Sequence, residues 1–170
     1  MSRIPLITDR EALDSEGRSA FDGIIESRGT MLRPFEVLLH SPAMAQHVAR
    51  LGHALRYESL LADADRELVI LATGHAQQCR FVWASHLEAA KTAGLTPGAL
   101  AAIEGTEGAL DLRQLTLVDF VRELCGDGTV SERTFEAARA ILTDPELVEL
   151  ALTVGYYTML GYAMGAFEAC

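Results

Sequence analysis

The sequence has 170 residues, a length typical of one folded domain. Hydrophobic residues make up 49% of the chain and charged residues 22%, which excludes a disordered or low-complexity protein. The formal net charge of −10 disfavours a nucleic-acid partner, because an acidic protein repels the phosphate backbone.

Cysteine usage and the first residues predict the compartment. The three cysteines, Cys79, Cys125 and Cys170, cannot all pair within one chain. The N-terminus reaches charged residues by Asp9 without the long apolar run of a secretory signal. We therefore expect a cytoplasmic protein whose thiols are reduced.

Helix signals recur along the whole chain. Ser41-Pro42, Thr96-Pro97 and Asp144-Pro145 each place a capping residue before a proline at the first helical position. No segment alternates apolar and polar residues for long enough to indicate a strand. The predicted helices lie near residues 10–27, 42–57, 63–76, 79–93, 97–104, 114–125, 131–142 and 145–168, with an irregular connection over 28–40. The expected fold class is all-α, an antiparallel bundle of about seven or eight helices.

The stretch from Glu67 to His86 is the most informative for chemistry. Its pattern changes after residue 74, which indicates that one helix ends and another begins just before Cys79. A thiol at a helix N-terminus lies at the positive end of the helix dipole, which stabilises the thiolate. Val82, Trp83 and His86 follow Cys79 at i+3, i+4 and i+7, on one face of the predicted helix.

Glu67 lies on the preceding predicted helix, where its carboxylate can orient and charge the imidazole of His86. Plain alternatives are that Cys79 is a small core residue and that Trp83 is ordinary core packing. A zinc site built from His75, Cys79, His86 and Glu67 is disfavoured, because no second cysteine accompanies the first. No glycine-rich nucleotide loop is present either, so neither a metal nor a cofactor is predicted.

Residues 150–167 contain no charged side chain. Eighteen residues is the lower limit of a membrane span, but the run holds threonines, glycines and tyrosines and is flanked by glutamates. A helix that is apolar on all sides is otherwise buried in a core or at an oligomer interface. Its tyrosines suit an interface, so we expect no membrane contact and a homo-oligomer. These tyrosines are Tyr156, Tyr157 and Tyr162.

At these residues the chain resembles the carboxymuconolactone decarboxylase and alkylhydroperoxidase-D superfamily. The signature of that superfamily is a glutamate, eleven residues, a cysteine, two residues, a second cysteine, three residues and a histidine. Glu67, Cys79 and His86 match it, and Val82 stands where the second cysteine would be. Another branch has Tyr-Glu-Trp-x-x-His on the same helix, which Trp83 and His86 match.

The resemblance implies an all-helical fold of the alkylhydroperoxidase-D type, often assembled as trimers or hexamers. It divides the chain into an N-terminal helix and connecting segment over 1–39, a superfamily core over 40–125, and C-terminal helices over 126–170. These last helices would pack on the core or on a neighbouring subunit. Peroxidatic members use a Glu–Cys–Cys–His relay, whereas other members decarboxylate a lactone without a cofactor.

Three functions follow from the resemblance. The favoured one is a cofactor-independent lyase or hydrolase for a small organic acid or lactone. In it His86 would transfer protons, Glu67 would set the charge of His86, and Cys79 would be a nearby thiol. Four further residues are expected to line the pocket and are given no catalytic role: His75, Phe81, Val82 and Trp83.

The second function is a one-cysteine peroxidase or reductase, in which Cys79 forms a sulfenic acid that an external thiol resolves. Within the chain only Cys125 or Cys170 could resolve it, provided that either lies within disulfide reach. The third is a non-enzymatic protein that uses the same fold for ligand binding or assembly. The expected homo-oligomer is a dimer, a trimer or a hexamer.

Overall fold

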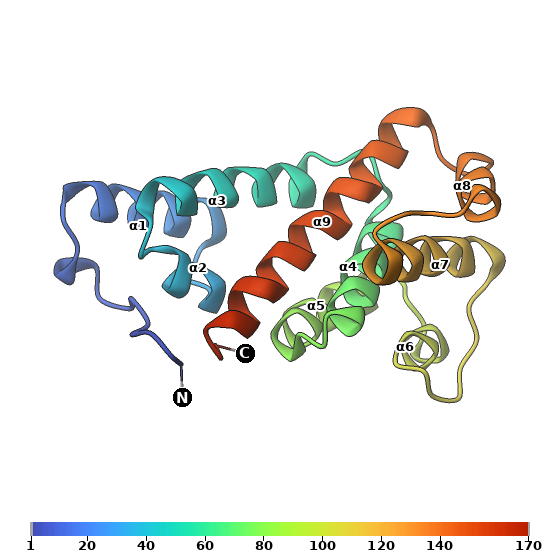
Figure 1. The fold of residues 1–170 in the computed structure, drawn as a ribbon, viewed down its shortest axis with the longest axis horizontal. Coiled ribbons are helices and arrows are strands. Elements are labelled where there is room, and N and C mark those ends of the chain that lie inside the picture. Colours follow the sequence, from blue (N-terminus) through green and yellow to red (C-terminus); the bar gives the residue numbers. More distant parts are fainter. Residues whose placement is uncertain (1, 170) are drawn as a thin grey trace. The chain divides into compact units, whose positions relative to one another are not determined.

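A computed structural model describes residues 2–169 of the chain. Over this range the protein is helical throughout, with one short 3-10 helix, nine α-helices and no strand (Figure 1). The predicted all-α fold class is therefore confirmed. Two compact units divide the chain: one holds the residues up to Glu58 and those from Tyr162 on, and the other is Ser59–Gly161. The segments predicted from the sequence divide the chain elsewhere, at residues 39 and 125.

The first unit contains the 3-10 helix η1 (Arg10–Ala12), α1 (Ser15–Arg28), α2 (Arg33–Leu38) and α3 (Pro42–Tyr57). Asp14 begins α1 by accepting a hydrogen bond from the Gly17 amide, and Gly29 ends it with a φ of 75°. The helices enclose a small core of their own. That core consists of Ala20, Ile24, Phe35, Leu39, Ala45 and Ala49.

Two expectations for this unit are wrong. The first long helix begins at Ser15 rather than near residue 10, because Asp9 and Asp14 cap two separate elements. The connection over 28–40 is not irregular, because it contains α2. Six residues are too few to show helical periodicity in a sequence, but buried Phe35 and Val37 hold this turn of helix in place.

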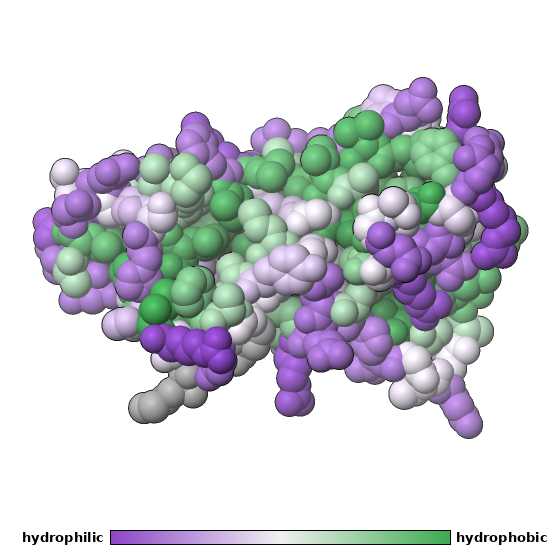
Figure 2. All heavy atoms as spheres, viewed as in Figure 1, coloured by the Kyte–Doolittle hydropathy of each residue, from purple (hydrophilic) through white to green (hydrophobic). Residues whose placement is uncertain are grey.

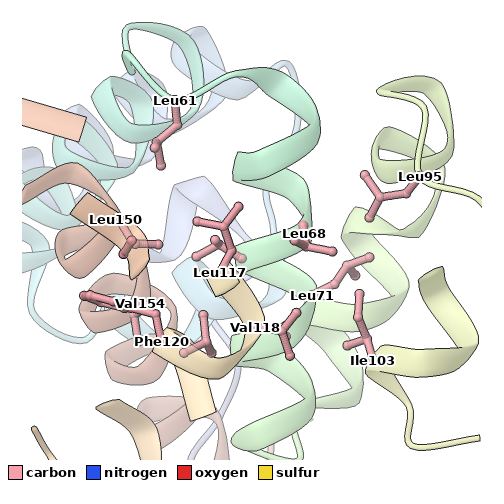
Figure 3. Packing of buried hydrophobic residues seen from close by; sticks show 14 of the residues in the cluster. Leu61, Leu68, Leu71, Leu95, Ile103, Leu117, Val118, Phe120, Leu150 and Val154 are labelled. Carbon is pink, nitrogen blue, oxygen red and sulfur yellow. The ribbon is translucent and has the colours of Figure 1, made fainter. Parts of the chain in front are cut away.

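The second unit contains α4 (Asp63–Ala76), α5 (Arg80–Thr92), α6 (Pro97–Ile103), α7 (Leu112–Asp127), α8 (Glu132–Arg139) and most of α9 (Asp144–Ala166). Each predicted helix of this region is present, with ends that differ by a few residues. α4 is the central element and packs mainly against α5 and α7. Side chains from α4, α6, α7 and α9 meet in one core, where Leu68 and Leu71 lie near Leu117 and Val118 (Figure 3).

An ion pair fixes the start of α4 against α7. Arg113 donates to both oxygens of Asp65, with its Nη2 2.7 Å from Oδ2, and its Nη1 donates to the Ile141 carbonyl at 3.0 Å. The carboxylate of Asp65 raises the pKa of Arg113. This bidentate contact joins α4, α7 and the turn before α9 in a fixed register.

α9 is only partly covered within the chain. Val148, Leu152 and Met159 are 60%, 47% and 40% exposed and form a stripe with Gly155 on one face of the helix, while Leu150 and Val154 are buried. In Figure 2 the surface along α9 is mostly green or pale, the colours of hydrophobic and weakly polar residues. Over residues 2–169, no helix combines the length and the hydropathy that a membrane span requires.

Candidate functional site

The turn between α4 and α5 places Cys79. The Gln78 amide donates to the His75 carbonyl and the Cys79 amide donates to the Gly74 carbonyl, the two bonds of a Schellman motif. Gln78 takes the left-handed conformation that this motif needs, with a φ of 53°. Cys79 then becomes the N-cap residue of α5. The predicted helix break before the cysteine is therefore present, and the thiol lies at the N-terminus of α5.

Glu67, His86 and Tyr157 form a buried chain of side chains. Nδ1 of His86 lies 2.8 Å from Oε2 of Glu67, and Nε2 of His86 lies 3.2 Å from the Tyr157 hydroxyl. The rings of His86 and Tyr157 meet edge to face, with centroids 5.2 Å apart. All three residues are buried, so solvent screens their interaction little. α4, α5 and α9 each contribute one member.

These two hydrogen bonds determine which ring nitrogen of a neutral His86 carries the proton. An ionised carboxylate can only accept hydrogen bonds, so the proton lies on Nδ1 and is donated to Glu67. Nε2 is then an acceptor, and the Tyr157 hydroxyl donates to it.

Cys79 lines a cavity of about 630 Å³ beside the α4–α5 turn. Trp83, Ala84 and Gly74 form apolar parts of its wall, and His75, Arg80 and Glu104 bring charge or hydrogen-bonding groups. Its volume is that of a typical small-molecule site. Cys79 is only 2% exposed, so its surface reaches solvent only narrowly.

Residues 42–111 match the model of the carboxymuconolactone decarboxylase family. Through this segment, which is less than half of the chain, the protein is similar to that family. The matched residues include Glu67, Cys79 and His86, and they run from the start of α3 past the end of α6. The resemblance that the sequence indicates is confirmed. Tyr157 lies outside the family segment. No curated protein matches the chain.

Solved structures share the fold. An uncharacterized peroxidase-related protein with an alkylhydroperoxidase AhpD core, from Ralstonia eutropha JMP134, is 21% identical with a TM-score of 0.80, covering 99% of this chain and 91% of its own. A peroxidase-related protein from Silicibacter sp. TM1040 is 18% identical with a TM-score of 0.76, covering 98% and 92%. A protein of unknown function from Agrobacterium tumefaciens is 18% identical with a TM-score of 0.67, covering 77% and 92%.

The three residues that match the family signature, Glu67, Cys79 and His86, lie in two neighbouring parts of the site. The expected contact between Glu67 and His86 is present, whereas Cys79 faces the cavity, whose lining does not include His86. Of the four expected lining residues, His75 and Trp83 do line it, and their rings meet with centroids 6.4 Å apart.

Phe81 and Val82 are not among the lining residues. Val82 is buried and packs on Gly74, where an added Cβ atom would lie 2.8 Å from the Val82 Cγ1 atom. The position of the family's second cysteine therefore serves to pack α5 on α4.

Sequence reasoning missed several residues of the site. Tyr157 was expected at an oligomer interface but contacts His86, 71 positions away, a distance that helix periodicity cannot bridge. The cavity is also lined by Gln78, Arg80 and Glu104, and the first two offered a sequence signal because they lie directly beside Cys79 in the chain.

The other cysteines do not extend the site. Cys125 is half-buried, with its sulfur 3.9 Å from the Thr158 hydroxyl, and it forms no disulfide with Cys79. Cys170, the other candidate resolving thiol, lies outside the described residues. Between residues 2 and 169, no cluster of three or more His, Cys, Asp or Glu side chains has an arrangement that could hold a metal ion.

Proposed function

We propose that this protein is a one-cysteine thiol peroxidase that reduces small hydroperoxides at Cys79. The observation that carries the proposal is the position of Cys79 at the N-terminus of α5, on the wall of a cavity of about 630 Å³. A helix N-terminus stabilises the thiolate, which is the nucleophilic form of cysteine. His86 does not line this cavity, so the thiol is the family residue best placed to meet a substrate there.

The reaction needs one hydroperoxide and two external thiols. The Cys79 thiolate attacks the peroxide oxygen, an S–O bond forms, the O–O bond breaks, and the leaving alkoxide takes up a proton to become an alcohol. One external thiol then condenses with the sulfenic acid and releases water. A second thiol cleaves the mixed disulfide, which restores Cys79 and yields an oxidised thiol pair.

External thiols replace the resolving cysteine of the family. Val82 occupies its position and is packed against Gly74, so no local disulfide can form with Cys79. The reducing cytoplasm that the sequence predicts would supply small thiols. Two solved structures with this fold are of peroxidase-related proteins, which supports the same reaction class.

A second function is favoured by the Glu67–His86–Tyr157 chain. A buried His that is oriented by a carboxylate can transfer protons in a cofactor-free lyase or hydrolase for a small organic acid or lactone. The substrate would have to reach His86, which is buried and is not among the residues that line the cavity.

Trapping of the sulfenic acid tests the proposal. Reduced protein is treated with hydrogen peroxide or cumene hydroperoxide in the presence of dimedone, and the labelled peptide is identified by mass spectrometry. We expect label on Cys79, catalytic peroxide consumption with glutathione, and loss of both in Cys79→Ser. Cys125→Ser is the matched control, since its thiol is half-buried and lies away from the cavity.

Three results separate the alternatives. A Cys79→Ser protein that still consumes peroxide at the wild-type rate contradicts the proposal. Hydrolysis or decarboxylation of lactones that Cys79→Ser retains and His86→Gln loses favours the second function. Absence of both activities, with Cys79 unlabelled, favours a non-enzymatic binding or assembly protein.

We also propose that the chain forms a homo-oligomer in which a second copy covers the exposed stripe on α9. The stripe carries no charge, whereas the chain as a whole has a net charge of −10. Like-charged copies repel each other least where both present an uncharged apolar face.

A further inference from the structure

We propose that the cavity beside Cys79 binds the reducing thiol of the reaction, and that this thiol carries both a carboxylate and an ammonium, as an amino-acid thiol does. Arg80 binds the carboxylate of this ligand, and Glu104 binds its ammonium. The inference rests on the proposed peroxidase function and names the chemical class of its second substrate.

Arg80 and Glu104 line the cavity from two different helices. Arg80 is the first residue of α5, directly after Cys79, and Glu104 is the C-cap residue of α6. Both residues line the same cavity of about 630 Å³ and both are exposed. Over residues 2–169, neither side chain takes part in an ion pair or a hydrogen bond. Two opposite charges therefore line one cavity without a partner in the described part of the chain.

The position of each charge is unfavourable for the helix that carries it. The N-terminus of a helix has a partial positive charge, and the C-terminus has a partial negative charge. Arg80 lies at the positive end of α5, and Glu104 lies at the negative end of α6. Neither placement stabilises the fold, so the two charges are better explained by a ligand that carries the opposite charges.

A ligand with a single charge accounts for only one of the two residues. A carboxylate-bearing hydroperoxide or thiol pairs with Arg80, but it is repelled by Glu104 and by the net charge of −10 of the whole chain. Stabilisation of a Cys79 thiolate likewise accounts for Arg80 alone, because the Glu104 carboxylate acts in the opposite direction. A molecule with one charge of each sign pairs with both residues and is not repelled by the chain.

The thiol step of the reaction is the step that needs such a ligand. Val82 is packed on Gly74 in the place of the family's second cysteine, so the reducing thiol comes from solution. Because Cys79 is only 2% exposed, an incoming thiol has to approach it from a narrow range of directions. Ion pairs at the other end of the thiol hold it in such a direction and raise the rate of attack.

The thiol step is balanced with water as a product. The sulfur of the ligand forms an S–S bond with Cys79 while the S–O bond of the sulfenic acid breaks, and the hydroxyl leaves as water with the proton of the thiol. A second molecule of the thiol then forms a disulfide with the first and restores the Cys79 thiol.

Binding can be measured without any reaction, because the only tryptophan of the sequence, Trp83, lines the cavity. The probe is S-methylcysteine, whose methylated sulfur cannot reduce a sulfenic acid. Methylthiopropionate lacks the ammonium of this probe, and methylthioethylamine lacks its carboxylate. From the change in Trp83 fluorescence we expect S-methylcysteine to bind about 3- to 10-fold more tightly than either analogue. Equal affinities, or no change in emission with S-methylcysteine, would overturn the proposal.

Two variants assign each charge of the ligand to its partner. Arg80→Gln should weaken the binding of S-methylcysteine and methylthiopropionate about 3- to 10-fold, but not that of methylthioethylamine. Glu104→Gln should weaken the binding of S-methylcysteine and methylthioethylamine, but not that of methylthiopropionate. Both variants should fold, since each removes a charge that is unfavourable at its helix end.

Arg133→Gln and Glu107→Gln are the matched controls, because these exposed residues are not among those that line the cavity. They should leave all three affinities unchanged. Controls that weaken binding as much as Arg80→Gln and Glu104→Gln would show that the ligand senses only the overall charge of the chain, and would overturn the proposal.

The rate at which the sulfenic acid is reduced tests the role of the ligand in the reaction. Oxidised protein is mixed with cysteine, cysteamine, mercaptopropionate or uncharged mercaptoethanol, and each rate is divided by the rate with mercaptoethanol for the same protein. This ratio cancels any effect of a variant on Cys79 itself. We expect the ratio for cysteine to fall about 3- to 10-fold in Arg80→Gln and in Glu104→Gln. Ratios that match those of the wild type in both variants would contradict the proposal.

Failure of the two proposals can be told apart. If hydrogen peroxide leaves no sulfenic acid on Cys79, the peroxidase function is contradicted, while the fluorescence titration still tests the ligand site. If the sulfenic acid forms and neither binding nor reduction depends on the charges of the ligand, this inference alone is contradicted.

Discussion

Gly74 of α4 and Val82 of α5 pack so closely that a Cβ atom on the glycine would lie 2.8 Å from the valine Cγ1 atom. The next nearest atoms, at 3.1 Å and 3.5 Å, are the Val82 Cβ atom and the Trp83 amide nitrogen. Any side chain at residue 74 therefore pushes on the first turn of α5. Because Cys79 begins that turn, this contact fixes the thiol relative to α4.

Gly74→Ala should destabilise the protein by about 1 to 3 kcal/mol, the usual cost of an atom added to a packed contact. The matched control is Gly23→Ala, since an added Cβ at residue 23 meets no atom within 4 Å. That change should stabilise α1 by about 0.5 to 1 kcal/mol through the higher helix propensity of alanine. Urea unfolding of both variants measures the difference, and equal stabilities would contradict the close packing of α4 on α5.

Val82→Cys should restore the two-thiol spacing of the family. Cysteine is smaller than valine, so it fits beside Gly74 without a new clash. We expect the introduced thiol to form a disulfide with Cys79 after peroxide treatment, and peroxide reduction to depend on a dithiol rather than on glutathione. Non-reducing peptide mapping checks the bond. A folded variant with no such disulfide would show that more than this position separates the chain from two-cysteine members.

Leu152→Glu and Met159→Glu should dissociate the proposed oligomer without unfolding the chain. Both side chains are 40% or more exposed within one chain, so their charge is buried only where a second copy covers α9. Light scattering at micromolar concentration measures the mass, and circular dichroism confirms folding. A wild-type mass of 18.4 kDa, that of one chain, would refute assembly. Exposed Glu132→Gln on α8 is the control and should leave the mass unchanged.

Stability should fall in acid through Glu123. Hydrogen bonds from the Thr134 hydroxyl and the Ser131 amide lower the pKa of Glu123 below its ordinary value of 4.5. A carboxyl whose pKa is lower in the folded state stabilises the protein above the unfolded pKa, and this contribution is lost as the pH falls through the folded pKa. Glu123→Gln should therefore flatten the fall in thermal stability below pH 4.5, whereas Glu107→Gln on an exposed loop should follow the wild type. Parallel curves for wild type and Glu123→Gln would contradict this account.

Local sequence signals predicted most of the helices and half of the candidate site. Capping residues and prolines mark where helices begin, because they act within one turn of the chain. Glu67, Cys79 and His86 belong to two consecutive helices joined by a tight turn, so their spacing along the sequence carries information about their faces. α2 was missed because six residues show no periodicity and burial of Phe35 holds it in place.

Tertiary packing alone decided which further groups join those residues. Tyr157 contacts His86 because α9 returns to α5 after 71 residues, and Glu104 joins the cavity of Cys79 for a similar reason. The uncharged run over 150–167 indicated burial, but only packing determined which face of α9 is covered and which remains exposed. Such contacts depend on the angles at which helices pack in the folded protein. Neither the composition nor the spacing of neighbouring residues specifies which residue far along the sequence will make the contact.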